Sequence, residues 1–348
     1  MPNNRAACLT AAFLLTTLSA TAADIKAPIR GLVSMGPMKF SAENSEPANT
    51  LEPLNARPGI FGGIVVLATW RQLQPSANAA IPADNTIDRA LEEVRAYNRK
   101  NPQRPLGVKL RVWSGIMAPD WAKQIGGEPI PVVHNNKQRT LGRFWSPAYR
   151  HAWANFQEKL AARYDSEPLI REVAVTSCMS FTAEPFYLDD EPSVSGPLNA
   201  AEFKPFQFKQ CLNDIVKDYA PWKTTNIEVP LNPIYMPLGN KTGDPAFTED
   251  FMRSCRKEFG KRCIFDNHDF DTKPPGSMVP IYASMMKLGP PFEFQTFHVA
   301  PPDWDGTIRK AASMGAGSIE LWQDYKGFQT QPDAKLKQWA RIMESGGK

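Results

Sequence analysis

The feature that most constrains the fold is a regular alternation of short β-rich runs with helical patterns along the chain. Eight strands are expected, at residues 31–35, 63–67, 108–112, 173–176, 226–229, 263–266, 292–295 and 318–321. Segments with apolar residues at helical spacing lie between them. Strands that alternate with helices form a parallel sheet, and eight such units close into a barrel. The sequence therefore predicts an α/β protein with a single (β/α)8 barrel.

An open, doubly wound sheet is the alternative architecture for this alternation. No G-x-G-x-x-G pattern follows the first expected strands, and Gly62 and Gly63 precede a strand instead of opening a helix. A chain of 348 residues could hold two domains, but barrels of this length commonly form one unit. We expect one barrel domain at residues 23–348.

Three of the expected helices begin with residues that favour the N-cap position. A Ser or Asn side chain at this position accepts a hydrogen bond from a backbone N–H of the first helical turn. The expected caps are Asn85, Ser146 and Asn199.

The first 22 residues have the pattern of a secretory leader. Arg5 is the only charged residue there, residues 6–18 form an apolar stretch, and small residues at 20–22 form the expected cleavage site. No later run is long and apolar enough to cross a bilayer. We therefore expect an exported protein, periplasmic or extracellular, without stable membrane association. A formal net charge of +4 is too small to indicate a dedicated nucleic-acid-binding protein.

Export would also place the cysteines in an oxidising compartment, where disulfides form. Cys8 leaves with the leader, and four cysteines remain, namely Cys178, Cys211, Cys255 and Cys263. Four cysteines allow three pairings, and proximity in the sequence favours Cys255 with Cys263, which leaves Cys178 with Cys211. The alternative is four buried thiols. The absence of C-x-x-C and of a close Cys/His cluster argues against a zinc site.

Polar and aromatic residues gather where the expected strands end, which is the edge of a barrel that carries the active site. Aromatic rings beside carboxylates and amides suit a sugar, because C–H faces stack on rings while hydroxyls need donors and acceptors. The expected ligand is an oligo- or polysaccharide. The candidate substrate-binding residues are Trp70, Arg111, Trp113, Tyr187, Asn232, Asn267, His268, Gln295 and Trp322. The competing interpretation for the tryptophans is that they cap the core.

Three local patterns stand out at these strand ends. Residues 70–75 read Trp-Arg-Gln-Leu-Gln-Pro, residues 183–185 read Ala-Glu-Pro, and Trp322 follows the last strand. Together they resemble the clan of retaining (β/α)8 glycoside hydrolases whose catalytic glutamates follow strands four and seven. Members carry W-x-x-L-x-P after strand two, N-E-P after strand four and a substrate-platform Trp after strand eight. The resemblance implies a glycosidase in which Glu184 is the acid/base, with Ala183 in place of the usual Asn.

The second catalytic carboxylate is open between Glu293 and Glu320. Side chains alternate along a strand, so Glu293 and Gln295 share a face, and Glu293 lies about 6.6 Å deeper in the barrel. Glu320 lies nearer its strand end and shares a face with Trp322, which slightly favours Glu320. A pair of Glu184 with Glu320 would cross the barrel, and its spacing could suit inversion instead of retention.

Both glutamates also have a structural interpretation. They could be buried acids paired with Lys109 or Arg111, whose alternating face points into the barrel as well. Gln295 cannot act as a nucleophile. The second functional hypothesis is therefore a barrel that binds saccharides without hydrolysing them.

One weak pattern suggests metal binding, because His268 lies beside Asp266 and Asp269. No H-x-H and no second histidine after an early strand supports it. A serine hydrolase is disfavoured too, since the chain has no G-x-S-x-G. From the sequence we expect neither a metal nor another cofactor.

Overall fold

A computed structural model describes residues 24–36, 49–178, 181, 183–186, 188, 191–235 and 243–346. Eight parallel strands form one sheet in the order β8-β7-β6-β3-β2-β1-β10-β9. Parallel bridges from Phe265 to Phe292 and from Phe270 to Thr296 join its two outer segments, so the sheet forms a nearly closed (β/α)8 barrel. The predicted fold is therefore confirmed. The strands are β1 (Gly31–Met35), β2 (Gly63–Thr69), β3 (Gly107–Trp113), β6 (Ile170–Ala174), β7 (Asn226–Pro230), β8 (Cys263–Asp266), β9 (Glu293–Gln295) and β10 (Ser318–Trp322).

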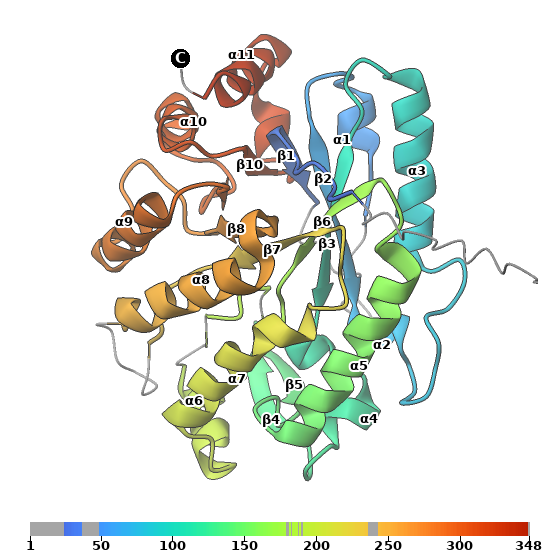
Figure 1. Cartoon of the computed structure of the whole chain (residues 1–348), viewed down its shortest axis with the longest axis vertical. Helices are drawn as coiled ribbons and strands as arrows, with labels where there is room; N and C mark the ends of the chain where they lie inside the picture. The colour runs from blue at the N-terminus through green and yellow to red at the C-terminus, as the bar shows by residue number, and fades with distance from the viewer. Residues whose placement is uncertain are drawn as a thin grey trace, which may run out of the picture.

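Helices connect the strands and surround the barrel, as Figure 1 shows. The longer ones are α3 (Thr86–Lys100), α5 (Pro147–Tyr164), α6 (Pro192–Ala200), α7 (Pro205–Asp218), α8 (Pro245–Phe259), α9 (Val279–Leu288), α10 (Trp304–Ser313) and α11 (Asp333–Glu344). Three helices of one turn are α1 (Glu52–Asn55), α2 (Trp70–Leu73) and α4 (Asp120–Lys123). Single 3-10 turns occupy Gly115–Met117, Gly260–Arg262, Gly276–Met278 and Phe328–Thr330.

Alternation along each strand separates the apolar shell from the barrel interior. In β3, Val108, Leu110 and Val112 are buried on the face toward the helices, whereas Lys109 and Arg111 are buried on the inner face. Both faces of a parallel strand in a barrel are covered, which is why the whole strand is buried. The charged residues of β3 are therefore buried inside the barrel.

Two details differ from the sequence-based expectations. The fourth barrel strand ends at Ala174 instead of extending to residue 176, since the Thr176 N–H donates to the Tyr219 hydroxyl and leaves the ladder. Asn85 and Ser146 cap helices as expected. Asn199 is not a cap, because it lies inside α6, and α7 begins later with Pro205 at its first turn.

A hairpin inserted between β3 and α5 was not expected. It consists of β4 (Ile130–His134) and β5 (Lys137–Leu141), which pair antiparallel. Asn135 and Asn136 form its turn with φ of 50° and 58°, a conformation that Asn tolerates better than most residues. The hairpin was missed because Asn-Asn is a weaker turn signal than Asn-Gly.

The segment before β1 lies at the opposite end of the barrel from the strand C-termini. The Lys26 ammonium donates hydrogen bonds to the Ile170 carbonyl at 2.9 Å and to the Thr225 hydroxyl at 2.8 Å. The backbone N–H of Ile29 donates to a Glu172 carboxylate oxygen at 2.6 Å. These contacts attach the beginning of the described chain to the N-terminal ends of β6 and β7.

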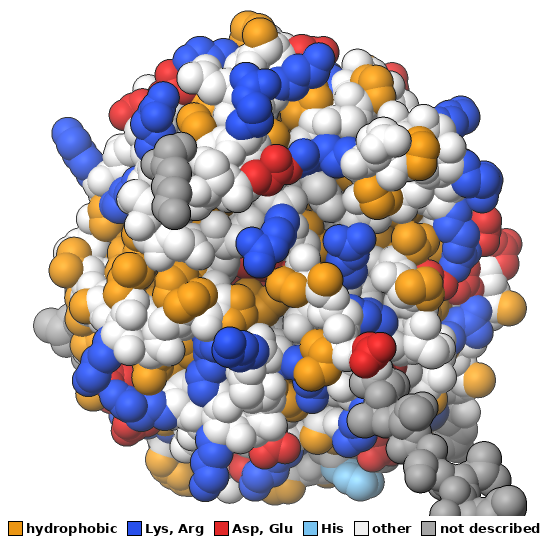
Figure 2. Space-filling model, turned by 45° about the horizontal axis from the view of Figure 1, so that its top comes forward, with side chains coloured by type: hydrophobic (Ala, Val, Ile, Leu, Met, Phe, Trp, Pro, Cys, Tyr) orange, Lys and Arg blue, Asp and Glu red, His pale blue; other side chains and the backbone are white. Residues whose placement is uncertain are grey.

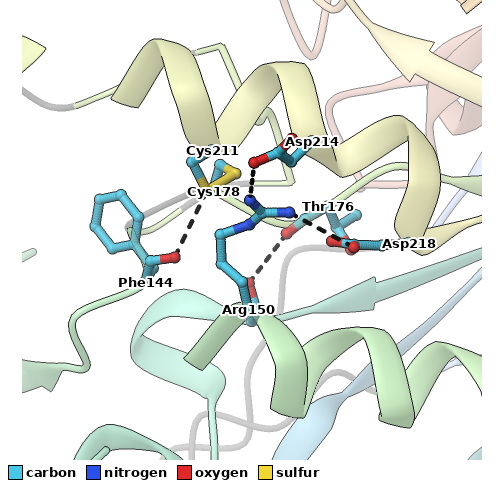
Figure 3. Close-up of a disulfide and its surroundings, with 8 residues drawn as sticks. Phe144, Arg150, Thr176, Cys178, Cys211, Asp214 and Asp218 are labelled. Atoms are coloured by element: carbon cyan, nitrogen blue, oxygen red, sulfur yellow. Dashed lines mark hydrogen bonds and ion pairs between the residues drawn. A yellow bond between two sulfur atoms is a disulfide. The ribbon is translucent and has the colours of Figure 1, made fainter. Parts of the chain in front are cut away.

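Two disulfides are present in the pairing that sequence proximity favours. Cys178, which follows β6, is bonded to Cys211 of α7, and Cys255 of α8 is bonded to Cys263 at the start of β8. Beside the first bond, Arg150 of α5 lies between Asp214 and Asp218 of α7 (Figure 3). These links fix α7 and α8 to the barrel.

No helix among the described residues is long and apolar enough to span a bilayer. The expected leader at residues 1–22, including Cys8, lies outside the described residues. Figure 2 shows Lys and Arg side chains scattered over one face, interrupted by apolar and acidic ones, which accords with the small net charge.

The two disulfides should contribute unequally to stability. They join cysteines 33 and 8 positions apart, and the cost of closing a loop in the unfolded chain grows with loop length. A Cys178→Ala/Cys211→Ala variant should therefore lose about 1 kcal/mol more unfolding free energy than Cys255→Ala/Cys263→Ala. Urea denaturation of the oxidised proteins measures the difference, and equal losses would contradict it.

Candidate functional site

A pocket opens at the C-terminal ends of the barrel strands, where a barrel carries its active site. Its volume of about 160 Å³ corresponds to about five water molecules. The lining combines rings and aliphatic groups with a guanidinium, an amide, an imidazole and two carboxylates. The lining residues are Met35, Leu67, Arg111, Trp113, Ala183, Glu184, His268, Asp269, Gln295, Phe297 and Trp322.

Glu184 lies in the segment after β6 and is held from two neighbouring strands. Its side chain is 18% exposed. One carboxylate oxygen accepts a hydrogen bond from the Asn232 amide at 2.9 Å, and the other lies 3.2 Å from Nδ1 of His268. Ala183 cannot supply an amide, so Asn232, which follows β7, provides one to this carboxylate. The carboxylate is thereby oriented at the pocket wall.

Asp269 is the second carboxylate of the lining and was not among the catalytic candidates predicted from the sequence. Burial, and to a lesser extent the negative charge of Glu184, raise its pKa to about 6, although the positive charge of His268 acts in the opposite direction. The signal that could have found Asp269 is its place in the loop directly after β8, three residues beyond Asp266.

Aromatic rings form part of the pocket wall. Trp113 ends β3, Trp322 ends β10, and Phe297 follows β9 with 54% of its surface exposed. The Trp322 indole N–H donates to the Thr296 carbonyl at 2.7 Å, which fixes the ring plane. Trp113 and Trp322 are thus placed at the pocket as expected, and Phe297 adds a third ring.

Arg111 and Gln295 form the floor of the pocket together with His268. The Arg111 guanidinium donates to the Gln295 side-chain oxygen at 3.3 Å and to both oxygens of Glu320 at 2.9 and 3.1 Å. Arg111 is only 2% exposed, so its charge is balanced mainly inside the barrel. The guanidinium links the pocket to the charged interior below.

Glu293 and Glu320 lie in that interior and do not line the pocket. Lys109 forms ion pairs with both, at 2.7 Å to Glu320 and closer to Glu293. Burial raises the pKa of Glu293 well above its usual range, with Glu172 contributing. Burial opposes ionisation of Glu320, but Arg111 and Lys109 lower its pKa overall. This geometry supports the structural interpretation of both acids, since neither carboxylate reaches the pocket.

Three other expected binding residues are placed differently. Trp70 is fully buried beneath α5, with its ring 5.1 Å from that of Trp153, and does not line the pocket. This corrects its expected role, because the α2 turn directs the indole into the helix layer. Asn267 is also fully buried and donates to Asn232 at 3.0 Å, so it supports the residue that holds Glu184. Tyr187 lies outside the described residues.

His268 connects the pocket to two deeper acids. Burial and the Arg111 charge lower the pKa of the imidazole, but hydrogen bonds to Asp266, Glu184 and Glu228 raise it well above its usual range overall. Within the described residues, ligand atoms of Glu228, Asp266 and His268 lie within 4.8 Å of one another. This cluster could hold a metal ion.

Comparison with known proteins gives a likeness of fold only. No family model matches the sequence, and no curated protein matches it. Similar solved structures include endo-glycoceramidase II from Rhodococcus sp., at 15% identity over 86% of this chain and 75% of that one, with a TM-score of 0.45. A probable tagatose 6-phosphate kinase from Sinorhizobium meliloti has 11% identity, coverage of 84% and 65%, and a TM-score of 0.42.

A third similar structure is the carboxyl transferase domain of pyruvate carboxylase from Rhizobium etli. It has 12% identity over 92% of this chain and 47% of that one, with a TM-score of 0.40. These names span unrelated reactions, so the function must be inferred from the residues of the pocket.

Removing Lys109 should destabilise the barrel. A Lys109→Met variant leaves Glu293 and Glu320 buried without their ammonium partner, and breaking a buried pair in this way costs about 3 to 5 kcal/mol. The acids would then ionise less readily, so the loss should shrink as the pH falls from 7 to 5. Chemical denaturation at both pH values measures it, with exposed Lys257→Met as the control. An equal effect of the two substitutions would contradict this role.

Proposed function

We propose that the protein hydrolyses glycosidic bonds, with Glu184 and Asp269 as the pair of catalytic carboxylates. The observation that carries the proposal is the presence of both carboxylates in one pocket at the strand ends, beside the rings of Trp113 and Trp322. Glycoside hydrolysis requires two carboxyl groups that act on the same bond. The resemblance of residues 183–185 to the glycosidase motif supports Glu184 as one of them.

The lining suits a sugar ring. Trp113, Phe297 and Trp322 offer faces for C–H groups, while Gln295 and Arg111 offer donors and an acceptor for hydroxyls. The proposed substrate is therefore an oligo- or polysaccharide, of which a single residue enters the pocket of about 160 Å³.

The environments of the two carboxyl groups favour different roles. Asp269, with a pKa of about 6, retains its proton near neutral pH more often than an ordinary aspartate, which suits the general acid. Glu184 is oriented by Asn232 and His268 and would act as the nucleophile or base. This division reverses the role that the sequence resemblance gave to Glu184.

One observation favours a second candidate function, a barrel that binds saccharides without cleaving them. Gln295 occupies the pocket at the end of the seventh barrel strand, while Glu293 and Glu320 are held by Lys109. If Asp269 and Glu184 serve only as hydrogen-bonding groups, the rings and amides would still bind sugars.

Export is also part of the proposal. Two disulfides and the absence of a membrane-spanning helix among the described residues are compatible with a periplasmic or extracellular protein. The pattern of residues 1–22 supports a cleaved leader.

An Asp269→Asn variant should lose about 10²-fold in turnover on a glycoside with a poor leaving group, because the departing oxygen is no longer protonated. The loss should be much smaller on an aryl glycoside with a good leaving group. Asp120→Asn, whose side chain is 94% exposed, serves as the control. Equal losses on both substrates would remove Asp269 from the role of general acid.

The pH profile provides an independent check on Asp269. The protonated carboxyl is the active form, so kcat/KM of the unmodified protein should fall as the pH rises through about 6. The Asp269→Asn variant should lack this decline. A decline that persists in the variant would assign it to another group.

A Glu184→Gln variant should keep its affinity for the sugar and lose turnover by about 10²-fold or more. Calorimetric titration with the product sugar measures binding, and a glycoside assay measures turnover. Sugar binding by the unmodified protein without hydrolysis of any glycoside in a broad panel would favour the binding barrel instead.

A further inference from the structure

Three buried side chains from two adjacent strands meet beneath the pocket. Glu228 belongs to β7, Asp266 ends β8, and His268 follows it two residues later. Nε2 of His268 lies 3.3 Å from a carboxylate oxygen of Asp266 and 3.7 Å from one of Glu228. We propose that these three residues bind a divalent transition-metal ion.

The spacing of the three ligand atoms suits an ion of this class. Ligands about 2.1 Å from a metal lie about 3.0 to 3.4 Å apart in octahedral and tetrahedral sites. The separation between His268 and Asp266 is in this range, and that between His268 and Glu228 exceeds it by a few tenths of an ångström. All three ligand atoms lie within 4.8 Å of one another. Small side-chain movements would therefore bring the three ligand atoms to coordinating positions.

Buried carboxylate oxygens provide the second, independent observation. Both carboxylate oxygens of Glu228, and the Asp266 oxygen that faces His268, are buried and accept no hydrogen bond of good geometry among the described residues. Apart from His268, the cations near them are Lys109, at 3.9 Å from Asp266, and Arg111, at 4.0 Å from Glu228. The Glu228 and Asp266 side chains are fully buried. A buried carboxylate oxygen without a partner is costly, and a coordinated cation removes that cost.

The charges in the barrel interior show why Glu228 is held only by distant contacts, at 3.7 Å from His268 and 4.0 Å from Arg111. Lys109 and Arg111 are the fixed cations there. Lys109 contacts Glu293 and Glu320, and Arg111 is held by Glu320 at 2.9 Å but is 4.0 Å from Glu228.

Among the described residues, five interior acids therefore share Lys109, Arg111 and the His268 imidazole, so carboxyl groups outnumber cationic groups there. These acids are Glu172, Glu228, Asp266, Glu293 and Glu320. A divalent ion at Glu228 and Asp266 would supply further positive charge beside these carboxyl groups.

The second nitrogen of His268 has the environment expected of a metal ligand. Nδ1 lies 3.2 Å from the Glu184 carboxylate, so an N–H there can donate to Glu184 while Nε2 is turned toward the two acids. Histidines that ligate metals commonly donate their other N–H to a carboxylate in this way. The ion would thereby also orient Glu184.

Arg111 is the group that must yield to the ion. Its guanidinium lies 3.1 Å from Nε2 of His268. A metal ion bound to this nitrogen would replace that contact. Arg111 keeps its two contacts with Glu320 and its contact with Gln295 when this one is lost. One imidazole and two carboxylates suit Zn²⁺ or Mn²⁺ better than Ca²⁺, which prefers oxygen ligands only.

Metal binding can be measured directly on the purified full chain, so the result does not depend on the proposed glycosidase activity. After chelator treatment, the protein is dialysed against Zn²⁺ or Mn²⁺, and bound metal is counted by atomic emission. We expect one ion per chain and a higher melting temperature with the ion present. Less than about one tenth of an ion per chain with either metal would overturn the proposal, and the acids would then be neutralised by protons.

Two substitutions test the ligands. Glu228→Gln removes a ligand charge and should weaken binding by about 100-fold or more in calorimetric titration. Glu172→Gln is the matched control, because it removes an equally buried strand carboxylate that is not a ligand, and it should change affinity by no more than a few fold. Asp266→Asn serves as a second ligand variant if Glu228→Gln fails to fold. Equal weakening by the control and the ligand variants would contradict the assignment.

Discussion

The structure depends on the ion pairs that Lys109 and Arg111 form inside the barrel. Both cations lie on the inner face of β3, and each meets carboxylates from strands on the far side of the interior. Charges at such depth are tolerated only when they are paired with good geometry. The pairing ties together strands that share no backbone hydrogen bonds, so the polar interior specifies which strands face each other.

The same network determines what the pocket above it can do. Glu320 and Gln295 hold the Arg111 guanidinium at the floor of the pocket. His268 contacts both Arg111 and Glu184, which lies at the pocket wall. Catalytic or binding groups at the rim are thereby supported from below by groups that cannot rotate freely. Glu320, Arg111, His268 and Glu184 thus form a continuous series of side-chain contacts from the interior to the pocket wall.

Alternating hydrophobic patterns were sufficient to predict the barrel, because each buried strand has a run of apolar residues bounded by turn residues. The places of Glu184, Trp113 and Trp322 at the strand ends followed from the same count. The contact of Asn232 with Glu184 and the meeting of Glu228 with His268 did not, since they depend on register between strands distant in sequence. The placement of Trp70 was wrong for a similar reason, because a one-turn helix decides where its ring points.

The pairing of β1 with β10 has a consequence for how the chain reaches this fold. Gly31 is the register partner of Ser318, and the segment before it is attached to β6 and β7. The first strand is therefore synthesised long before its partner, and the barrel cannot close until residues 318–322 have been made. Until then, the ionisable groups of the interior remain in contact with water, and they lose their hydration only when the barrel closes.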